Sequence, residues 1–380
     1  MPQINFESEL SRCLGCKVKP CQKACPLGVS PHDFIEAAKN GDYTEAAQKI
    51  TSVNPLPQTC GLVCPDHFCQ KACIRARIDT PIEIPCLQAH ILQNAGLPPL
   101  ELPDTNGKTI AVIGGGPAGL GAIYELIISG YKVCLFEQSS ALGGAARLIP
   151  DYRLPKDVLD KEIARLTTND RVEVRLNTKI TDFKRIKEHY DGVILALGET
   201  TPRTLGVDGE ECCIPYASYL KNPHKYIGKK VAVTGGGEVA LDCALTAKKC
   251  GCDCVEMFVR RRKADMRIMK RDFLDLEQYN IIIRDLSSIT EIYKNDNDLA
   301  LNTIKNRIND QGKAEPCSGT ECILGGYDLL IQALGATYPK ENIPENYLIA
   351  GDMTGNGGTI VQALASGKAA AHRLIDGETI

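Results

Sequence analysis

The stretch "TIAVIGGGPAGL", residues 109–120, decides the fold, because an apolar run leads there directly into Gly114-x-Gly116-x-x-Gly119. In such a turn the first glycine permits the tight bend, the second lets the backbone approach a pyrophosphate, and the third allows close packing of helix on strand. The next strand, "YKVCLFE", ends at Glu137, where a carboxylate can accept hydrogen bonds from an adenosine ribose. We therefore predict a Rossmann-like dinucleotide site here.

The pattern occurs a second time in "KKVAVTGGGEVALDCAL", residues 229–245, with Ala240 in the third glycine slot, a change the fingerprint tolerates. The strand that follows ends not on an acid but on a group of arginines: Arg260, Arg261, Arg262 and Arg267. Such a cationic group suits a 2′-phosphate, so we expect NADPH over NADH. Two alternatives stay open. Glu256, earlier in the strand, would favour NADH if it faced the ribose, and the arginines could be only a solvated strand end.

Composition narrows the class of protein. The 380 residues and 41.3 kDa suit two or three domains, and 43% hydrophobic residues suffice to fill their cores. A formal charge of −3 does not indicate a nucleic-acid-binding protein. No apolar run is long enough to span a membrane. The N-terminus lacks the layout of a signal peptide, so we expect a cytoplasmic protein. Its 18 cysteines should then be reduced and better suited to metals than to disulfides.

Eight cysteines precede the first glycine turn, which indicates a separate N-terminal module. Between its two groups of cysteines, residues 30–50 predict two short helices that break at Asn40-Gly41, the first capped by Ser30. The Pro-rich segment 96–108 predicts a linker. By spacing alone, each group forms its own site, with two structural zinc sites as the alternative to iron and sulfur. The two groups are Cys13, Cys16, Cys21, Cys25 and Cys60, Cys64, Cys69, Cys73.

Further motifs extend over the rest of the chain and give it a family resemblance. They include "NPLPQTCGLVCP" (54–65), "IPDYRLP" (149–155) and "AGDMTGNGGTIVQA" (350–363). With the cysteine groups and both glycine turns, they make the chain resemble the glutamate synthase small-subunit family. Within it, the chain is most similar to the NAD(P)H-oxidising flavin and iron–sulfur subunits of bacterial dihydropyrimidine dehydrogenases.

The resemblance implies an α/β fold of two Rossmann-like domains, with an NAD(P)H-binding domain inserted in an FAD-binding domain. An α-helical iron–sulfur domain would occupy residues 1–105, the FAD-binding domain 106–200 and 325–380, and the NAD(P)H-binding domain 201–324. The FAD site would comprise Gly114, Gly116, Pro117, Ala118, Gly119, Glu137, Gly144, Arg153, Gly198, Gly351, Asp352, Gly358 and Thr359, including the loop from Asp352 to Thr359. The NAD(P)H site would comprise Gly235, Gly237, Glu238, Val239, Ala240, Arg260, Arg261 and Arg267.

The resemblance also implies two 4Fe-4S clusters whose ligands cross between the two cysteine groups. One cluster would take Cys13, Cys16, Cys21 and Cys73, and the other Cys25, Cys64, Cys69 and Gln88, with Cys60 spare. In two-cluster ferredoxins the cysteine before a proline likewise serves the other cluster, and Cys25-Pro26 has that form. The gap from Cys64 to Cys69 is one residue shorter than in the family, and Cys86 lies two positions before Gln88. Either departure could change a ligand.

The function implied is that of an electron-input subunit. Hydride from NAD(P)H would pass to FAD, and electrons would leave singly through the clusters, which zinc could not support. The chain has no motif for a final substrate, so we expect a separate catalytic reductase subunit, that of a dihydropyrimidine dehydrogenase, in a hetero-oligomer. A glutamate synthase subunit, a ferredoxin-coupled reductase and a scaffold or redox sensor without turnover are the alternatives. Cys317-x4-Cys322 has a disulfide-reductase spacing but lies far in sequence from the FAD turn.

Overall fold

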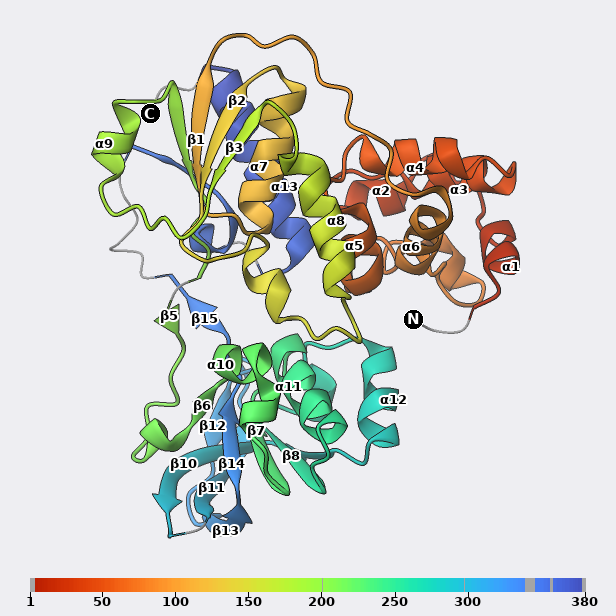
Figure 1. The fold of residues 1–380 in the computed structure, drawn as a ribbon. Coiled ribbons are helices and arrows are strands. Elements are labelled where there is room, and N and C mark those ends of the chain that lie inside the picture. Colours follow the sequence, from red (N-terminus) through yellow and green to blue (C-terminus); the bar gives the residue numbers. More distant parts are fainter. Residues whose placement is uncertain (1–3, 200, 297, 339–345, 356–357, 378–380) are drawn as a thin grey trace. The chain divides into compact units, whose positions relative to one another are not determined.

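The computed structural model describes residues 4–199, 201–296, 298–338, 346–355 and 358–377 (Figure 1). The chain forms two compact units. The first consists of residues 1–147, 151–200 and 338–380, and the second of residues 148–150 and 201–337. The second unit is thus inserted into the first along the sequence, as the resemblance implied.

The N-terminal part of the first unit is helical, as expected. Two of its helices confirm the prediction for residues 30–50, with a break at Asn40-Gly41. The side chain of Asp42 caps the second of them by accepting from the amide of Glu45 (2.8 Å), whereas Ser30 makes no such bond before the first. The elements are α1 (Phe6–Ser11), α2 (Pro20–Ala24), α3 (Pro31–Lys39), α4 (Tyr43–Thr51), α5 (Pro57–Val63), η1 (Ile74–Arg77) and α6 (Ile84–Ala95).

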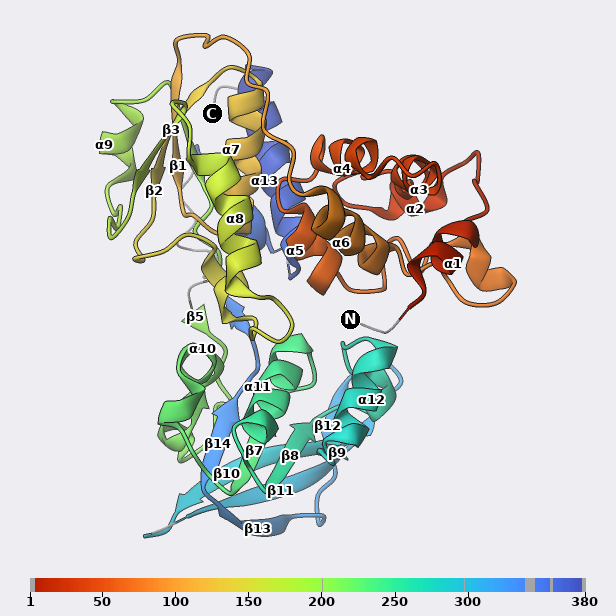
Figure 2. The ribbon, with the colours of Figure 1, turned by 45° about the vertical axis from the view of Figure 1, so that its right-hand side comes forward.

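The first Rossmann-like sheet is parallel, with strand order β16-β4-β1-β2-β3. Its helices α7, α8 and α13 lie on one face, and α9 lies on the other (Figures 1 and 2). The strands are β1 (Thr109–Ile113), β2 (Lys132–Phe136), β3 (Val172–Arg175), β4 (Gly192–Leu195) and β16 (Leu348–Ile349). The helices are α7 (Pro117–Ile128), η2 (Gly144–Leu148), α8 (Lys156–Thr167), α9 (Phe183–Lys187), η7 (Gly351–Thr354) and α13 (Ile360–Ile375).

Two glycines let α7 and α13 pack backbone against backbone. A Cβ on Gly121 would collide with the carbonyl oxygen of Leu364, and one on Gly367 would collide with that of Ala118. Because α13 belongs to the C-terminal segment, this contact brings that segment against the first glycine turn.

The helical module packs against the Rossmann-like half of the first unit. The two therefore form one compact unit, whereas the sequence predicted separate domains. The hydroxyl of Tyr124 on α7 donates to the carbonyl oxygens of Thr51 (3.0 Å) and Ser52 (2.8 Å) at the C-terminal end of α4. Lys368 on α13 donates to the carbonyl oxygen of Val53 (2.9 Å). The Pro-rich linker contains no regular element and is held by α8, where Arg165 donates to a linker carbonyl (2.6 Å).

The second unit contains another parallel sheet, with strand order β6-β14-β7-β8-β9. The elements of this layer are β6 (Ile214–Pro215), α10 (Tyr216–Lys221), β7 (Lys230–Thr234), α11 (Glu238–Lys249), β8 (Cys254–Val259), α12 (Lys270–Gln278), β9 (Ile282–Asp285) and β14 (Leu329–Gln332). Strand β14 pairs with β7, which corrects the predicted return to the FAD-binding domain at residue 325. The second unit continues to residue 337.

An antiparallel layer, which the sequence analysis did not anticipate, completes the second unit. It consists of β10 (Ser287–Lys294), β11 (Leu299–Ile308), β12 (Ala314–Pro316) and β13 (Cys322–Tyr327). A separate pair, β5 (Thr201–Pro202) and β15 (Ala336–Thr337), joins the two points where the chain enters and leaves this unit. In the part of the chain that the structure describes, no helix has the length and apolar character needed to cross a bilayer.

Candidate cofactor and cluster sites

The first glycine turn has the geometry that the fingerprint requires. Gly114 adopts a φ of +109°, and a Cβ there would collide with the carbonyl oxygen of Ala196, at the end of β4. A Cβ on Gly119 would collide with the carbonyl oxygen of Gly114, which shows why the helix needs glycine to pack here. At Gly116, by contrast, the nearest atom to an added Cβ is a Cα 3.8 Å away. The backbone at Gly116 is thus open to an anion at the start of α7.

The carboxylate of Glu137 is fixed beside this turn. It is buried, and it accepts hydrogen bonds from the amides of Gly115 (2.8 Å) and Ser139 (2.7 Å). Gly144, at a φ of +52°, meets Gly116, so a Cβ there would lie 2.9 Å from the Gly116 Cα. These contacts bring Gly116, Glu137 and Gly144 together around the N-terminus of α7.

The C-terminal segment reaches the same region. A Cβ on Gly351, whose φ is +80°, would lie 2.7 Å from the Cβ of Ala118 in the first turn of α7. The neighbouring Asp352 accepts from the amide of Gly358 (2.9 Å), and Thr359 caps α13 by accepting from the amide of Gln362 (3.3 Å). The N-termini of α7 and α13 therefore both border this region. Residues 356 and 357 of the predicted loop lie outside the described residues.

Two other predicted FAD residues lie outside the helices and strands. Arg153 is half-buried in a turn before α8. Gly198 follows β4 with a φ of +70°, two residues beyond the carbonyl that contacts Gly114.

The second glycine turn repeats the geometry of the first. Gly235 has a φ of +138° and sits against the carbonyl oxygen of Ala333, while a Cβ on Gly237 would meet no atom within 4 Å. Glu238 and Val239 open α11, and the buried Ala240 packs against Gly235. Open space at Gly237 at the start of a helix again suits a pyrophosphate.

Arg267 is tied to this second turn through its backbone. Its amide donates to the carbonyl oxygen of Gly236 (2.9 Å), and it forms an isolated parallel bridge with Gly237. Arg260 is exposed and Arg261 is half-buried, and both follow directly after β8. Arg262 is engaged elsewhere, because it pairs with Asp265 at 2.8 Å.

Glu256 is buried within the second unit and does not lie at the strand end. It is 3% exposed, and it accepts hydrogen bonds from Arg284 and from the hydroxyl of Tyr327 (2.9 Å). Although burial opposes ionisation, these donors hold the pKa of Glu256 below its ordinary value. Its carboxylate is therefore committed to two internal partners.

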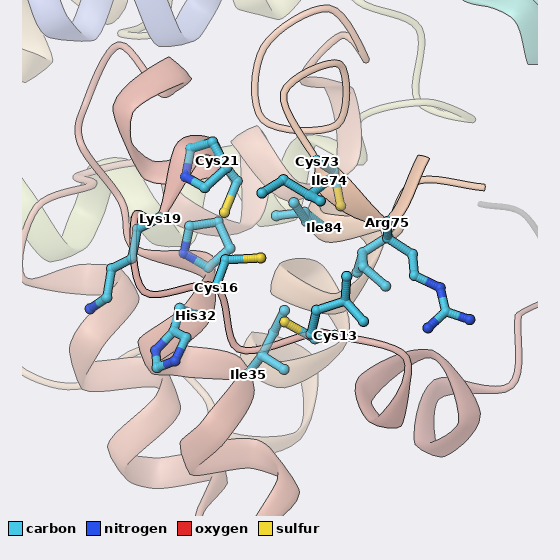
Figure 3. A pocket seen from close by; sticks show the side chains of 14 residues that line it. Cys13, Cys16, Lys19, Cys21, His32, Ile35, Cys73, Ile74, Arg75 and Ile84 are labelled. Atoms are coloured by element: carbon cyan, nitrogen blue, oxygen red, sulfur yellow. The ribbon is translucent and has the colours of Figure 1, made fainter. Parts of the chain in front are cut away.

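The first group of cysteines does not form a site by itself. Instead, Cys13, Cys16, Cys21 and Cys73 line one cavity, and their sulfur atoms point into it (Figure 3). The remaining wall is largely apolar, with Leu14, Ile35, Ile74, Ile82 and Ile84 among its lining residues. The structure thus brings together the four cysteines that the resemblance implied for one cluster.

Ionising these thiols without a bound cation would be costly. Burial, with smaller contributions from the nearby Cys73 and Cys13, raises the pKa of Cys21 to about 11. The pKa of Cys13 is also raised by burial. Iron would offset this cost, because thiolate is the form that binds metal. The donor set therefore fits an iron–sulfur cluster.

A second set of thiols gathers around α5 and includes one member of the first group. Burial raises the pKa of Cys64 well above its ordinary value, and repulsion from Cys60 and Cys25 raises it further. The pKa of Cys69 is raised in the same way, with contributions from Cys64, Cys25 and Cys21. Cys25 is therefore close enough to Cys60, Cys64 and Cys69 for its charge to raise the pKa of each.

The fourth position of this set has two candidates. Gln88, on α6, is buried and donates to the carbonyl oxygen of Pro57 at the start of α5 (2.5 Å). Cys60 is also buried, and its pKa is raised by burial and then by the charges of Glu162 and Cys25. Cys86 lies on the same helix as Gln88, and its thiol points to Glu83 (3.9 Å). Within the described ranges, no three His, Cys, Asp or Glu side chains converge to hold a single metal ion.

Glu162 is a residue at this site that the sequence analysis missed. It lies on α8, is fully buried, and accepts from the amides of Gln58 (2.5 Å) and Thr59 (3.0 Å) in the first turn of α5. The available signal was an acid on the apolar face of an amphipathic helix, beside Leu159 and Ile163.

Two family models match the chain. Residues 2–96 match the model described as dihydropyrimidine dehydrogenase domain II, 4Fe-4S cluster. Residues 108–363, well over half of the chain, match the model described as pyridine nucleotide-disulphide oxidoreductase. The prediction of iron–sulfur chemistry ahead of a flavin and NAD(P)H oxidoreductase is thereby confirmed.

Individual relatives and structures agree with these matches. The chain is 28% identical over 410 residues to the NAD-dependent dihydropyrimidine dehydrogenase subunit PreT of Salmonella typhimurium, with 98% of each chain covered. It is 30% identical to the NADP(+)-dependent formate dehydrogenase subunit beta of Moorella thermoacetica, over 83% of this chain and 50% of that one. The structure of Mycobacterium tuberculosis FprA in complex with NADPH superposes with a TM-score of 0.58 at 18% identity, covering 71% of this chain and 84% of that chain.

The similarity to FprA, at 18% identity, shows the fold alone. The match of residues 108–363 to a family model shows which family the chain belongs to. The chain belongs to the pyridine nucleotide-disulphide oxidoreductase family, as an NAD(P)H-dependent flavin oxidoreductase with an N-terminal iron–sulfur domain.

Proposed function

We propose that this chain is the electron-input subunit of a two-component reductase, which oxidises NADPH and delivers electrons through two 4Fe-4S clusters. The observation that carries the proposal is the convergence of Cys13, Cys16, Cys21 and Cys73 on one cavity. That cavity lies in the same compact unit as the first glycine turn. Cluster and flavin binding are thus functions of one packed body.

The FAD site is proposed around the N-termini of α7 and α13. FAD supplies the chemistry that connects the two halves of the reaction, since it accepts a hydride and can release electrons singly. Glu137 would accept hydrogen bonds from the adenosine ribose, and the open backbone at Gly116 would bind the pyrophosphate. Asp352, with Gly358 and Thr359, would bind the ribityl and pyrophosphate region of FAD. Gly144, Arg153 and Gly198 complete the proposed set.

The preference for NADPH rests on Arg267 and its neighbours. The bridge to Gly237 fixes the backbone of Arg267 beside the proposed pyrophosphate position, and Arg260 and Arg261 follow the adjoining strand. A 2′-phosphate would be bound by such guanidinium groups through charge-assisted hydrogen bonds. The burial of Glu256 supports the same preference, because that carboxylate is engaged by Arg284 and Tyr327.

For the second cluster we propose Cys25, Cys64, Cys69 and Gln88 as ligands. The charge of Cys25 raises the pKa values of both Cys64 and Cys69, which supports grouping the three thiols, and Gln88 lies against the helix that leads to Cys64. Cys60 is the competing fourth ligand, because its thiol is buried in the same group. An amide binds iron more weakly than a thiolate does, so the choice sets the potential of this cluster.

The partner proposed is the catalytic subunit of a dihydropyrimidine dehydrogenase, in a hetero-oligomer. The full-length similarity to PreT supports this assignment. The similarity to the formate dehydrogenase subunit supports a second candidate, in which the same input module serves a different reductase.

Anaerobic titration of the purified protein tests the proposal. NADPH should bleach the flavin absorbance at lower concentration than NADH, and iron analysis should give two 4Fe-4S clusters per chain. Absence of bleaching with both nucleotides would leave a scaffold or sensor as the function. Zinc found in place of iron would contradict the proposed iron–sulfur clusters. Addition of a co-expressed dihydropyrimidine dehydrogenase catalytic subunit should then couple NADPH oxidation to uracil reduction.

A further inference from the structure

The segments that carry the first cysteine cavity differ in charge from the rest of the protein. The chain as a whole has a formal charge of −3. Residues 10–32, which supply Cys13, Cys16 and Cys21, contain basic residues and no Asp or Glu. Residues 67–78, which supply Cys73, show the same bias. The basic residues of the two segments are Arg12, Lys17, Lys19, Lys23, Lys71, Arg75 and Arg77.

Three of these cations are committed to internal ion pairs. Arg12 pairs with Glu9 (2.6 Å), Lys19 with Asp33 (2.6 Å), and Arg75 with Asp79 (2.7 Å). The remaining four, namely Lys17, Lys23, Lys71 and Arg77, are exposed and make no ion pair with any described residue. Their charge is therefore available to a partner.

Large apolar side chains are exposed in the same two segments. Leu14 is 45% exposed, Val18 is 62% exposed and Ile78 is 65% exposed. Leu14 also lines the cysteine cavity, so one side of this residue faces the proposed cluster and the other faces solvent. The two segments are neighbours, because Arg75 donates to the carbonyl oxygen of Arg12 (3.3 Å) and Arg12 donates to that of Thr80 (2.6 Å). Exposed apolar groups among unpaired charges are typical of a binding surface.

We propose that this surface is where electrons leave the protein, and that it docks an acidic one-electron carrier protein. We call it the exit surface and define it by Leu14, Lys17, Val18, Lys23, Arg77 and Ile78. The inference rests on the proposed function, since it requires a cluster bound by Cys13, Cys16, Cys21 and Cys73. The partner would present carboxylates around an apolar centre that lies close to its own redox cofactor.

Two features of the exit surface argue for this kind of partner. Unpaired cations in the same segments as exposed apolar side chains complement an acidic partner and accelerate encounter with it. In addition, whatever covers Leu14 also covers one wall of the proposed cluster site, where an electron acceptor must approach closely. An anionic membrane or a second copy of this chain could also bind a surface with cations and exposed apolar side chains. The experiment below distinguishes these two from a carrier protein.

The test compares the holoprotein with two double variants of equal charge change. The variant Lys17→Glu/Lys23→Glu reverses charge on the exit surface, and Lys132→Glu/Lys184→Glu does so at exposed positions of the Rossmann-like half. The probes are an acidic ferredoxin, basic cytochrome c and the small dye benzyl viologen, each reduced by NADPH under anaerobic conditions. The dye reports internal electron flow without docking.

We expect the exit-surface variant to reduce the ferredoxin with kcat/KM lowered roughly tenfold or more, as charge reversal at a docking rim slows association. Dye reduction and iron content should match those of the wild type, cytochrome c reduction should not fall, and the control variant should reduce ferredoxin normally. A third variant, Val18→Gln/Ile78→Gln, should weaken ferredoxin reduction with less dependence on salt.

Other results would overturn the inference. Unchanged ferredoxin reduction by both exit-surface variants would do so, as would an equal loss in the control. Binding to phosphatidylglycerol vesicles that the charge reversal abolishes, with ferredoxin reduction intact, would assign the surface to a membrane. Loss of a wild-type dimer in sedimentation, with ferredoxin reduction intact, would assign it to self-association. If the wild type fails to reduce the dye, the proposed function itself fails, which is a distinct outcome.

Discussion

The carboxylate of Glu162 accepts a hydrogen bond from the backbone amide of Thr59 at 3.0 Å, and this bond joins helix α8 to helix α5. The two residues lie 103 positions apart in the sequence, one in the Rossmann-like half and one in the cysteine module. An acid at a helix N-terminus satisfies amides that have no partner within the helix and interacts favourably with the helix dipole. Because α5 leads to Cys64, Glu162 positions a proposed cluster ligand from the flavin-binding side.

Replacing this carboxylate should loosen the junction. Glu162→Ala would leave the amides of Gln58 and Thr59 buried without an acceptor, at a cost of about 2 kcal/mol in the free energy of unfolding. Anaerobic thermal unfolding should show a lower midpoint, and the second cluster should lose iron before the first. Glu173→Ala is the control, since Glu173 is exposed and forms a surface ion pair with the exposed Arg175, so it should have little effect. Equal effects of the two variants would contradict the positioning role.

Glu162 should also make stability depend on pH. Burial, although opposed by hydrogen bonds from Thr59 and Gln58, raises the pKa of this carboxyl from 4.5 to about 7. The folded state therefore binds the proton more tightly than the unfolded state. This contribution is complete below pH 4.5 and is lost as the pH rises to about 7, on the order of 3 kcal/mol. Glu162→Gln should show a flatter profile between pH 5.5 and 7.5 in thermal unfolding. A profile as steep as that of the wild type would exclude Glu162 as its source.

The cysteine assignment predicts selective loss of clusters. Cys73→Ser should disrupt the cluster of Cys13, Cys16 and Cys21, whereas Cys25→Ser should disrupt that of Cys64 and Cys69. Each variant should keep about half of the iron and should lose a different signal in electron paramagnetic resonance. If each group of four cysteines in the sequence instead bound its own cluster, Cys25→Ser would damage the same cluster as Cys13→Ser. Cys60→Ser should leave both signals intact if Gln88 is the fourth ligand.

The second and third glycines of the first glycine motif, Gly116 and Gly119, should respond differently to a methyl group. Gly116→Ala meets no atom closer than 3.8 Å, so the protein should fold while FAD binds at least tenfold more weakly, because the Cβ occupies the anion's approach. Gly119→Ala would collide with the carbonyl oxygen of Gly114 and should destabilise the fold. Flavin titration and thermal unfolding distinguish the two effects. Normal FAD affinity in folded Gly116→Ala would place the pyrophosphate elsewhere.

Nucleotide preference should change at Arg267 and not at Arg262. Removing a charge-assisted contact with a 2′-phosphate costs about 1.5–3 kcal/mol, so Arg267→Ala should raise KM for NADPH roughly 10- to 100-fold and leave KM for NADH nearly unchanged. Arg262→Ala serves as the matched control, since Arg262 already pairs with Asp265. Parallel losses with both nucleotides would show that Arg267 binds a part of the cofactor that they share.

Local sequence predicted the features whose geometry is local. Both glycine turns, the helices on either side of Asn40-Gly41 and the acid at the end of β2 follow from patterns a few residues long. The sorting of cysteines did not follow from spacing, because Cys73 reaches the cavity of Cys13 through the packing of α3, α6 and η1. That assignment came from the family resemblance.

Features that depend on distant partners were missed or misplaced. The strand at 329–332 closely mirrors the one at 192–195, and nothing within it specifies that it pairs with β7. The antiparallel strands β10 and β11 are rich in polar residues, so their apolar alternation is weak. Glu162 was overlooked because its acceptor role depends on a helix 103 residues away in the sequence.

The strand pair β5 and β15 has a practical consequence for protein engineering. Thr201 lies opposite Thr337 and Pro202 opposite Ala336, so the ends of the inserted unit are adjacent. The segment between them could be excised and closed by a short turn, or exchanged for the corresponding segment of a relative, without stretching the remaining chain. The preference for one nicotinamide coenzyme could then be exchanged together with the inserted unit, while the cysteines that determine where the electrons go stay in place.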